Sequence, residues 1–396
     1  MDKKESLDRG AEHCFFTEAN DSGSQLCKAN IPYGIAQIHH LQESLGLKPD
    51  ATFISTPDMT VSRNSVRWRS GFGYGGKVTW GGGDDGLVVL DVKPNGCGML
   101  VGGLDELPDI MAVVKRMHEL KNERHDIGGV EVAWNFNQSN HFIDVLKVEP
   151  AEGGIDLPPY AFIIHGSAPE FKGDNATGFG LYHDKSDALR EMAKESDGPF
   201  GKTLYLTGAD ARAYHEKFMM VDEFTKKKRS LVAKLLFGEH EEIANNCHQG
   251  MVNPNEVVLG CHHIEEGGIY PLTLRGDLPA YLVRGRHSLS PDAIERLGFE
   301  KRARKLGVYD RLLKADIVPH GGGQTFPEIL GVSKVITVEG IRYFEVQMQD
   351  DMGIQVVSDT NELAFEYRGR SVLMRLLDVG LADIAAKLVP QYVIKV

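Results

Sequence analysis

The sequence predicts a mixed α+β fold rather than a doubly wound or barrel fold. Strand patterns and helix patterns alternate irregularly, without the strand–helix–strand cadence of parallel α/β proteins. The 396 residues are 42% hydrophobic, which is enough for a large core in one or two domains. Neither an internal repeat nor a long low-complexity linker divides the chain. These three observations set the fold class, and local patterns then predict the elements in order.

The first half of the chain is expected to be rich in strands. Residues 70–103 are dominated by glycine, but the β-branched run from Gly86 to Val92 inside them predicts a strand. A helix is expected from Pro108 to Arg124, with proline near its first turn. Three further strands are then expected, at Val130–Trp134, Phe142–Val148 and Tyr160–His165.

The second half contains the longest helical pattern, from Asp210 to Gly238. Its apolar residues recur at spacings of three and four, at Ala211, Tyr214, Phe218, Val221 and Phe224. A short strand is expected at Ala280–Val283. The chain is expected to finish with a helix from Ser371 to Leu388 and a strand from Gln391 to Val396.

Composition and charge exclude several classes of protein. No apolar run approaches the roughly 20 residues that span a bilayer, and no signal peptide is visible. Five cysteines, an odd number without a CxxC motif, predict free thiols and a cytoplasmic location without a membrane partner. The net charge of −12 argues against a general nucleic-acid coat but leaves room for a local basic groove. The basic clusters 226–229 and 301–305 are each expected to be solvated helix faces.

A glycine loop headed by a histidine follows the apolar run 315–319. Its sequence is His320–Gly321–Gly322–Gly323–Gln324. Glycines permit positive φ and close approach, and consecutive N–H groups form a nest for anions such as phosphate. One interpretation is a phosphate cradle with a reactive histidine at its lip. The alternative is a surface turn with a histidine that has no special role.

Residues that commonly bind metals stand at strand ends and turns. His141 lies at the start of one predicted strand, and His165 ends another. His248 lies in the stretch NCHQG, and Cys97 lies in PNGCG shortly after Asp91. Imidazole, thiolate and carboxylate together suit Mn, Zn, Co or Fe(II). No short metal motif such as HExxH occurs, so the alternative that each histidine is only a hydrogen-bonded residue stays open.

In combination and in this order, the motifs resemble the RtcB family of GTP-dependent RNA ligases. These enzymes join an RNA 3′-phosphate or 2′,3′-cyclic phosphate end to a 5′-hydroxyl end, in RNA repair and tRNA processing. The resemblance spans about residues 55 to 396. It is carried by Pro57–Asp58–Met59, Asp91 with Cys97–Gly98, Asn140–Asp144, Ile164–Ser167, Cys247–Gln249, the 320–324 loop (HGAGR in the family), Glu366–Arg368 (near AYKD) and Leu388–Lys395 (near LxPxxViKG).

The resemblance implies a fold, cofactors and residue roles. The fold would be a single large domain over residues 1–396, with mixed β-sheets in a sandwich-like core flanked by helices and with 1–50 as a variable N-terminal extension. One or two Mn²⁺ ions and GTP would be the cofactors, and RNA ends the partners. His320 would be the nucleophile that takes GMP, and Asp58 would lie near the RNA end. The implied metal ligands are Cys97, His141, His165, His248 and Asp91, and the implied nucleotide contacts are Asn140, Phe142, Asp144, Gly321, Gly322, Gly323, Tyr367 and Lys395.

Three positions depart from the family pattern. Asp91 and Cys97 have five residues between them where the family has two. Gln324 replaces the loop arginine, which removes a charge that could bind phosphate. His165 is followed by Gly–Ser–Ala–Pro instead of the family's SGSRG. Two alternatives to a ligase therefore stay open: a metal-dependent phosphatase or RNA end-processing enzyme of the same fold, and a catalytically silent RNA-end binding protein.

Overall fold

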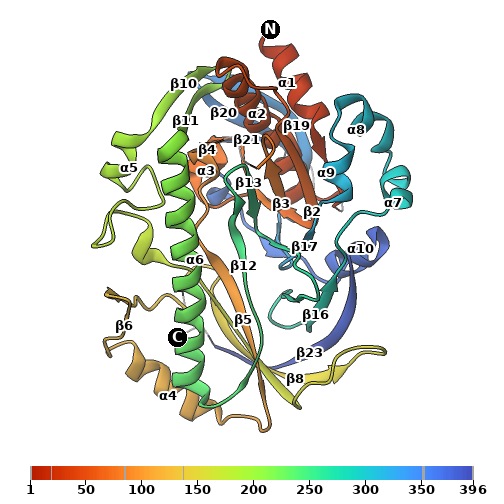
Figure 1. The fold of residues 1–396 in the computed structure, drawn as a ribbon. Coiled ribbons are helices and arrows are strands. Elements are labelled where there is room, and N and C mark those ends of the chain that lie inside the picture. The colour runs from red at the N-terminus through yellow and green to blue at the C-terminus, as the bar shows by residue number, and fades with distance from the viewer. Residues whose placement is uncertain (1, 19, 84–85, 137, 350–352, 395–396) are drawn as a thin grey trace.

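A large mixed sheet runs through the molecule and confirms the α+β prediction (Figure 1). The computed structural model describes residues 2–18, 20–83, 86–136, 138–349 and 353–394. β1 and β2 are parallel, and the other neighbouring pairs of this sheet are antiparallel. Its eleven strands lie in the order β1 (Cys14–Phe15), β2 (Thr52–Thr60), β3 (Tyr74–Thr79), β13 (Glu256–Leu259), β12 (Glu241–Asn253), β5 (Cys97–Leu104), β9 (Tyr160–Gly166), β8 (Phe142–Pro150), β23 (Ala382–Ile394), β16 (Ala280–Gly285) and β15 (Ile269–Leu272).

Smaller sheets surround the large one. The three-stranded sheets are β10 (Lys194–Gly198), β11 (Gly201–Thr207) and β4 (Leu87–Val89), and β19 (Ile329–Val338), β20 (Ile341–Met348) and β21 (Ile354–Val357). The two-stranded sheets are β14 (Cys261–His263) with β17 (Ile317–Pro319), β18 (Gln324–Thr325) with β22 (Glu366–Tyr367), and β6 (Asp126–Ile127) with β7 (Val130–Glu131). Short 3₁₀ turns are η1 (Leu90–Val92), η2 (Pro169–Phe171) and η3 (Thr360–Glu362).

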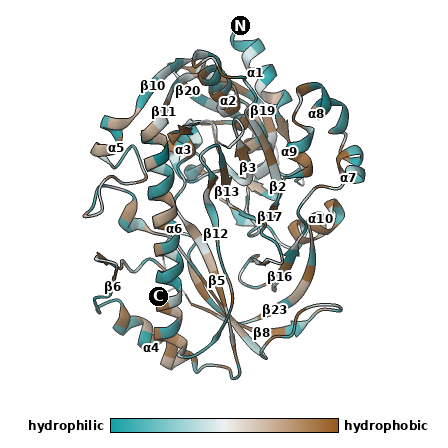
Figure 2. Cartoon of the chain, in the orientation of Figure 1, coloured by the Kyte–Doolittle hydropathy of each residue, from teal (hydrophilic) through white to brown (hydrophobic). Residues whose placement is uncertain are grey.

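Helices cover the sheet in two groups (Figure 1). Buried side chains of α2 (Ser22–Ser44) and α6 (Gly208–Phe237) share one hydrophobic cluster with the sheet, and those of α7 to α10 share a second. Figure 2 shows brown, apolar stretches along the central strands and teal patches on the outer helices. The remaining bounds are α1 (Lys3–Glu12), α3 (Ser65–Arg69), α4 (Ile110–Leu120), α5 (Asp187–Met192), α7 (Pro291–Arg296), α8 (Glu300–Leu306), α9 (Tyr309–Leu313) and α10 (Ser371–Val379).

Most predicted elements are confirmed, and the C-terminal helix is the clearest error. The helices at 108–124 and 210–238 and the strands at 142–148, 160–165 and 280–283 are present with small shifts at their ends. The helix from Ser371 ends at Val379, because Gly380 adopts a φ of +79° and terminates it. The following residues, from Ala382 onward, form β23 between β8 and β16. Alanines favour helix locally, but burial between two strands overrides that preference.

Two shorter strand predictions hold only in part. The run from Gly86 to Val92 is a strand as far as Val89 and then becomes the 3₁₀ turn η1. The strand predicted at 130–134 is reduced to the two residues of β7.

Residues 2–18 and 20–50 contribute a strand and buried helix surface to the core. β1 pairs with β2 at one edge of the large sheet. Most of α2 is buried, and Asp21 caps its N-terminus by accepting a hydrogen bond from the Ser24 N–H. The segment is therefore needed to complete the hydrophobic core in this structure.

Over the described ranges, no helix combines the length and the apolar character needed to cross a membrane. Each of the five cysteines is a free thiol.

Candidate metal centre and histidine loop

Four side chains that can bind a metal come from four neighbouring strands. Cys97 begins β5, His141 directly precedes β8, His165 lies near the end of β9, and His248 lies within β12. These strands are adjacent in the sheet, in the order β12, β5, β9, β8. Because neighbours are antiparallel, the start of β5 meets the end of β9, and Phe142 pairs with His165. Sheet register thus brings together residues that lie far apart in the sequence.

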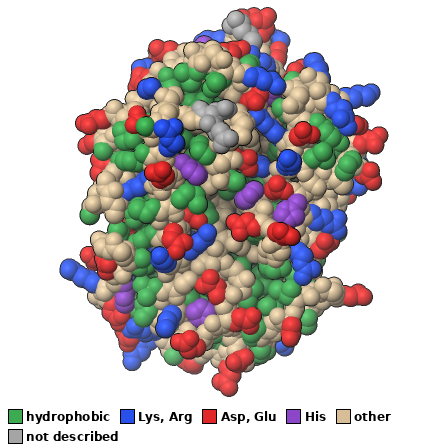
Figure 3. Space-filling view, in the orientation of Figure 1, with side chains coloured by type: hydrophobic (Ala, Val, Ile, Leu, Met, Phe, Trp, Pro, Cys, Tyr) green, Lys and Arg blue, Asp and Glu red, His purple; other side chains and the backbone are tan. Residues whose placement is uncertain are grey.

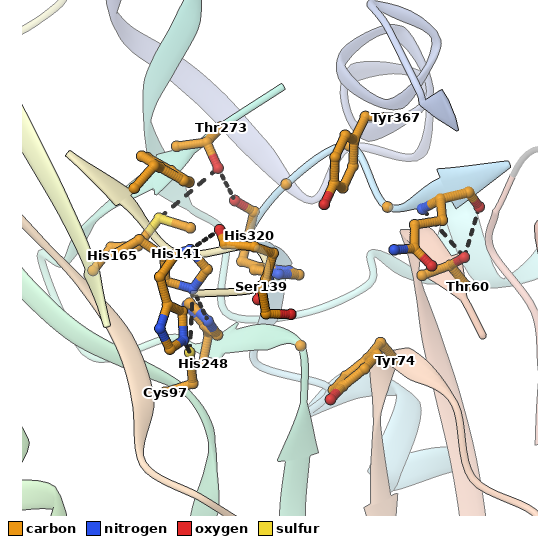
Figure 4. Close-up of a pocket in the computed structure, with 18 of the residues that line it drawn as sticks. Thr60, Tyr74, Cys97, Ser139, His141, His165, His248, Thr273, His320 and Tyr367 are labelled. Carbon is orange, nitrogen blue, oxygen red and sulfur yellow. Dashed lines mark hydrogen bonds between the residues drawn. The ribbon is translucent and has the colours of Figure 1, made fainter. Parts of the chain in front are cut away.

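The ligand atoms of Cys97, His165 and His248 lie within a few ångströms of one another, and His141 lies beside Cys97 (Figure 4). The Cys97 Sγ is 3.2 Å from the His165 Nε2 and 3.5 Å from the His141 Nε2. The Nε2 atoms of His165 and His248 are 3.2 Å apart. A bulge in β12 between Cys247 and Gln249 interrupts the pairing with β5 at His248. The donor atoms of Cys97, His165 and His248 all lie within 4.8 Å of one another and are buried, and they form a group that fits a metal ion.

Main-chain carbonyls fix the orientation of two imidazoles. The His141 Nδ1 is 2.8 Å from the Asn135 carbonyl oxygen, and the His165 Nδ1 is 3.1 Å from that of Asn140. A carbonyl only accepts, so each Nδ1 carries the proton and each Nε2 lone pair faces the group. This outer support is what metal-binding histidines ordinarily have.

Burial sets the protonation of the ligands. It is the main cause that lowers the pKa of His165 and of His248 well below the ordinary value. It also raises the pKa of the Cys97 thiol to about 12. At neutral pH the imidazoles are therefore neutral and ready to bind, while the thiol loses a proton when a metal binds. One thiolate with imidazoles suits Zn, Co, Fe or Mn.

Metal affinity is expected to rise about tenfold per pH unit between about pH 6 and 8, with one proton released per ion. The thiol is the source of that proton, because burial raises the pKa of Cys97 to about 12 and lowers the pKa of His165 and of His248 well below the ordinary value. Competition of the protein with a chelator for Zn²⁺, repeated at several pH values, measures the slope.

Cys97→Ser is expected to remove most of the slope, whereas Cys247→Ser is expected to keep it, because Cys247 is outside the ligand group. A slope of two or more protons in the unmodified protein would contradict neutral imidazoles.

His320 stands against this group and is held from behind by Asp58. Its ring centroid is 4.4 Å from that of His248. The Asp58 Oδ2 accepts hydrogen bonds from the His320 Nδ1 at 2.9 Å and from the main-chain N–H groups of His320 and Gly321, both at 3.2 Å. The other oxygen of Asp58 accepts from the Thr56 hydroxyl at 2.6 Å. With the proton on Nδ1, the His320 Nε2 keeps its lone pair.

The structure shows the surroundings of two parts of the site expected from the sequence. Asp58, expected near the RNA end, has a fully buried side chain. In one interpretation of the sequence the N–H groups of the loop cradle phosphate, and in the structure those of His320 and Gly321 donate to the Asp58 carboxylate. The sequence could not show either contact, because 262 residues separate Asp58 from His320.

A cavity of about 420 Å³ joins the metal group to the predicted nucleotide contacts. Its wall includes Cys97, three of the histidines described above and His320. Figure 4 shows Tyr367 and Ser139 across the same space. Of the expected nucleotide contacts, Lys395 lies outside the described residues, and the others line the cavity: Asn140, Phe142, Asp144, Gly321, Gly322, Gly323 and Tyr367.

Asp91 is not part of the metal group. Its carboxylate accepts a hydrogen bond from the Leu204 N–H at 3.1 Å and lines a different cavity with Arg69 and Lys202. Burial raises the pKa of Asp91 to about 7. Asp91 lies within η1, and the loop that follows this turn leads to Cys97. The longer spacing in the sequence therefore corresponds to a carboxylate that lies outside the metal group.

Sequence reasoning missed two buried cations beside the site. Lys228 and Arg229 were expected on a solvated helix face, but both side chains are buried. Lys228 pairs with Glu170 at 2.8 Å. The Arg229 guanidinium packs against Gly98, next to Cys97. The three-and-four spacing that begins at Ala211 continues to position 228. The sequence pattern therefore already placed Lys228 on the buried face of the helix.

No family model matches the chain, and comparison with curated proteins finds no match.

Proposed function

We propose that the protein is an RNA ligase that joins 3′-phosphate or 2′,3′-cyclic phosphate ends to 5′-hydroxyl ends, with GTP and Mn²⁺. The observation that carries the proposal is His320, which is hydrogen-bonded to Asp58 and packs against a Cys/His group that could hold a metal, at the wall of one cavity. The proposal includes the finer fold implied by the resemblance, a single domain with a sandwich-like core, and a cytoplasmic location.

The first step is transfer of GMP to the histidine. The His320 Nε2 lone pair attacks the α-phosphorus of GTP, an N–P bond forms, and the bond to the β-phosphate oxygen breaks, releasing pyrophosphate. The ring becomes cationic as it reacts, and the Asp58 carboxylate at Nδ1 stabilises that charge. A metal ion held by Cys97, His165 and His248 would neutralise phosphate oxygens.

The later steps restore the histidine. An oxygen of the RNA 3′-phosphate attacks the phosphorus of the histidine adduct, the N–P bond breaks, and GMP is transferred to the RNA end. The 5′-hydroxyl of the second RNA end then attacks the 3′-phosphorus, and GMP leaves as a phosphodiester forms. A cyclic phosphate end is first opened by water.

The walls of the cavity suit a nucleotide. Phe142 and Tyr367 offer aromatic faces for a base, and Asp144 offers a carboxylate that accepts hydrogen bonds. Arg63 also lines the cavity and stacks on Phe365, with the guanidinium carbon 4.8 Å from the ring centroid. That cation is suited to an RNA phosphate next to the reacting end.

Surface charge favours recognition of an RNA end rather than of a long duplex. The chain carries a net charge of −12, and Figure 3 shows acidic and basic side chains interspersed over the face in view. Without a broad basic surface on that face, binding energy has to come from the cavity.

The test is the intact mass of the protein after incubation with GTP and Mn²⁺. We expect a covalent GMP adduct that is lost in acid, as phosphoramidates are, and is discharged by RNA with a 3′-phosphate. Failure to form an adduct with any nucleotide or divalent metal would contradict the ligase proposal.

One feature favours a second candidate, a metal-dependent RNA-end phosphatase. Three protein ligands with an open fourth position are the usual arrangement of a hydrolytic zinc site, and Cys97, His165 and His248 are three such donors. Release of inorganic phosphate from RNA 3′-phosphate ends, without an adduct, would identify this activity. Binding without either reaction would indicate a silent RNA-end binding protein.

A further inference from the structure

Arg368 lies under the histidine loop and binds main-chain oxygens from two separate segments. Its Nη1 donates to the carbonyl oxygens of Asp58 and Gly322, both at 3.2 Å. Its Nη2 donates to the carbonyl oxygen of Met59 at 2.9 Å. The side chain is almost fully buried and does not line the cavity. It therefore links the strand that carries Asp58 to the loop that carries His320 without reaching the substrate space.

The remaining donors of Arg368 bind Asp21. Nη2 donates to one carboxylate oxygen at 2.7 Å, and Nε donates to the other. A guanidinium has five N–H groups. The two oxygens of Asp21 and the three carbonyl oxygens together provide one acceptor for each of these five N–H groups. Only arginine has this planar set of donors, because lysine offers three from a single nitrogen.

The segments around Arg368 are packed too closely for side chains. Gly323 has a φ of +65°, and a Cβ there would lie 2.4 Å from the Asp58 carbonyl oxygen and 2.5 Å from the Arg368 Nη1. A Cβ on Gly322 would lie 2.6 Å from the Arg368 carbonyl oxygen. The loop, the 58–60 strand and Arg368 are thus in direct contact, which explains the glycines independently of any phosphate.

Thr60 makes a second link between the same segments. Its hydroxyl donates to the Gln324 carbonyl oxygen at 2.6 Å and accepts from the Gln324 N–H at 3.2 Å. Arg368 and Thr60 therefore both link the strand that carries Asp58 to the loop that carries His320.

We propose that Arg368 is a positioning residue that sets the separation and orientation of Asp58 and His320. The expected effect on the labelling rate rests on the proposed function, whereas the effect on the contact between Asp58 and His320 does not. The carboxylate and the imidazole come from segments that are adjacent only in the folded chain, and a misplacement of about 1 Å can cost about 100-fold in rate. Through Asp21, the same guanidinium connects the start of α2 to the site.

Arg368→Lys is the main test variant, measured for the rate of GMP labelling at saturating GTP and for the KM for GTP. We expect the rate to fall at least about tenfold while KM changes less than about threefold, because Arg368 does not touch the cavity. Bound metal and Tm are measured on the same sample, and bound metal is expected to be unchanged.

Arg375→Lys is the matched control. The Arg375 Nε donates to the Thr17 carbonyl oxygen at 2.8 Å, and the guanidinium pairs with Asp378, so it also ties the C-terminal part to the N-terminal segment. Its hydrogen bonds go to Thr17 and Asp378 and not to the 58–60 strand or the histidine loop, so its labelling rate is expected to stay within about twofold of the unmodified rate. An equal loss in both variants would overturn the positioning role.

A spectroscopic readout separates this inference from the ligase proposal. In ¹⁵N-histidine-labelled protein, the His320 Nδ1–H signal reports the hydrogen bond to Asp58 whether or not the protein labels. Arg368→Lys is expected to shift or broaden it, and Arg375→Lys is not. An unchanged His320 signal would overturn the inference, while absence of an adduct in the unmodified protein would overturn only the ligase proposal.

A third variant covers the case in which Arg368→Lys does not fold. Asp21→Asn keeps a good helix cap and keeps Arg368, but removes the charge that holds the guanidinium. It is expected to shift the same His320 signal and to slow labelling about three- to tenfold. An unchanged signal in Asp21→Asn would overturn the inference.

Discussion

His320→Ala is expected to abolish GMP labelling, with a loss of at least about a thousandfold, while bound metal stays unchanged. The expectation follows from geometry. His320 lines the cavity and its ring packs against His248 at a tilt, but its Nδ1 is engaged by Asp58, so Nε2 is the nitrogen left for attack. The substitution removes the nucleophile and leaves Cys97, His165 and His248 in place. Intact mass with GTP and Mn²⁺, alongside metal analysis, measures both outcomes.

His263→Ala is a suitable control for this prediction. His263 lies on β14, which pairs with the strand leading into the histidine loop, but it does not line the cavity. Its adduct yield is expected to match the unmodified protein. A persistent adduct in His320→Ala would show that another residue is the nucleophile.

Much of the site could be predicted because its ligands occupy positions that sequence patterns reveal. Cys97, His141 and His165 lie at or beside recognisable strand ends. Because adjacent strands are antiparallel, the start of one lies next to the end of its neighbour, and these residues come close together. His248 was a candidate because of its setting in NCHQG, but its place within a long strand was not predicted. Asp91 shows the limit of motif matching. It lies in the turn η1, and its carboxylate binds the Leu204 N–H instead of joining the metal group.

Burial on one face made α6 predictable, whereas α2 and the start of β23 were missed because their surroundings in the fold override the local pattern. α6 shows a three-and-four spacing because its other side meets solvent. α2 is buried on most sides and encloses polar residues such as Gln37 and His39, so no apolar stripe marks it. β23 begins with alanines whose local preference is helical, and only its neighbours β8 and β16 make it a strand.

Contacts between distant segments could not be predicted from local patterns. Asp58 was expected near the RNA end, and Arg368 was given no role. In the structure Asp58 binds the His320 ring, and Arg368 binds the main chain of Asp58. Their partners are mostly main-chain atoms, which have no signature in the sequence. The support of a reactive residue is for this reason the part that requires coordinates.

Asp58→Asn is expected to slow GMP labelling by about 10²- to 10⁴-fold while leaving the fold and the metal group intact. The amide can keep the hydrogen bonds: its oxygen accepts from the His320 Nδ1 and from the two loop N–H groups, and its nitrogen donates to the Thr56 hydroxyl. What is lost is the negative charge that stabilises the imidazolium as the N–P bond forms, so the effect falls on the rate and not on the KM for GTP. Thr56→Val is the control, because it removes one hydrogen bond from the other carboxylate oxygen and retains the charge. Single-turnover labelling of both variants measures the difference, and a rate for Asp58→Asn within about threefold of the unmodified protein would show that His320 reacts without its carboxylate.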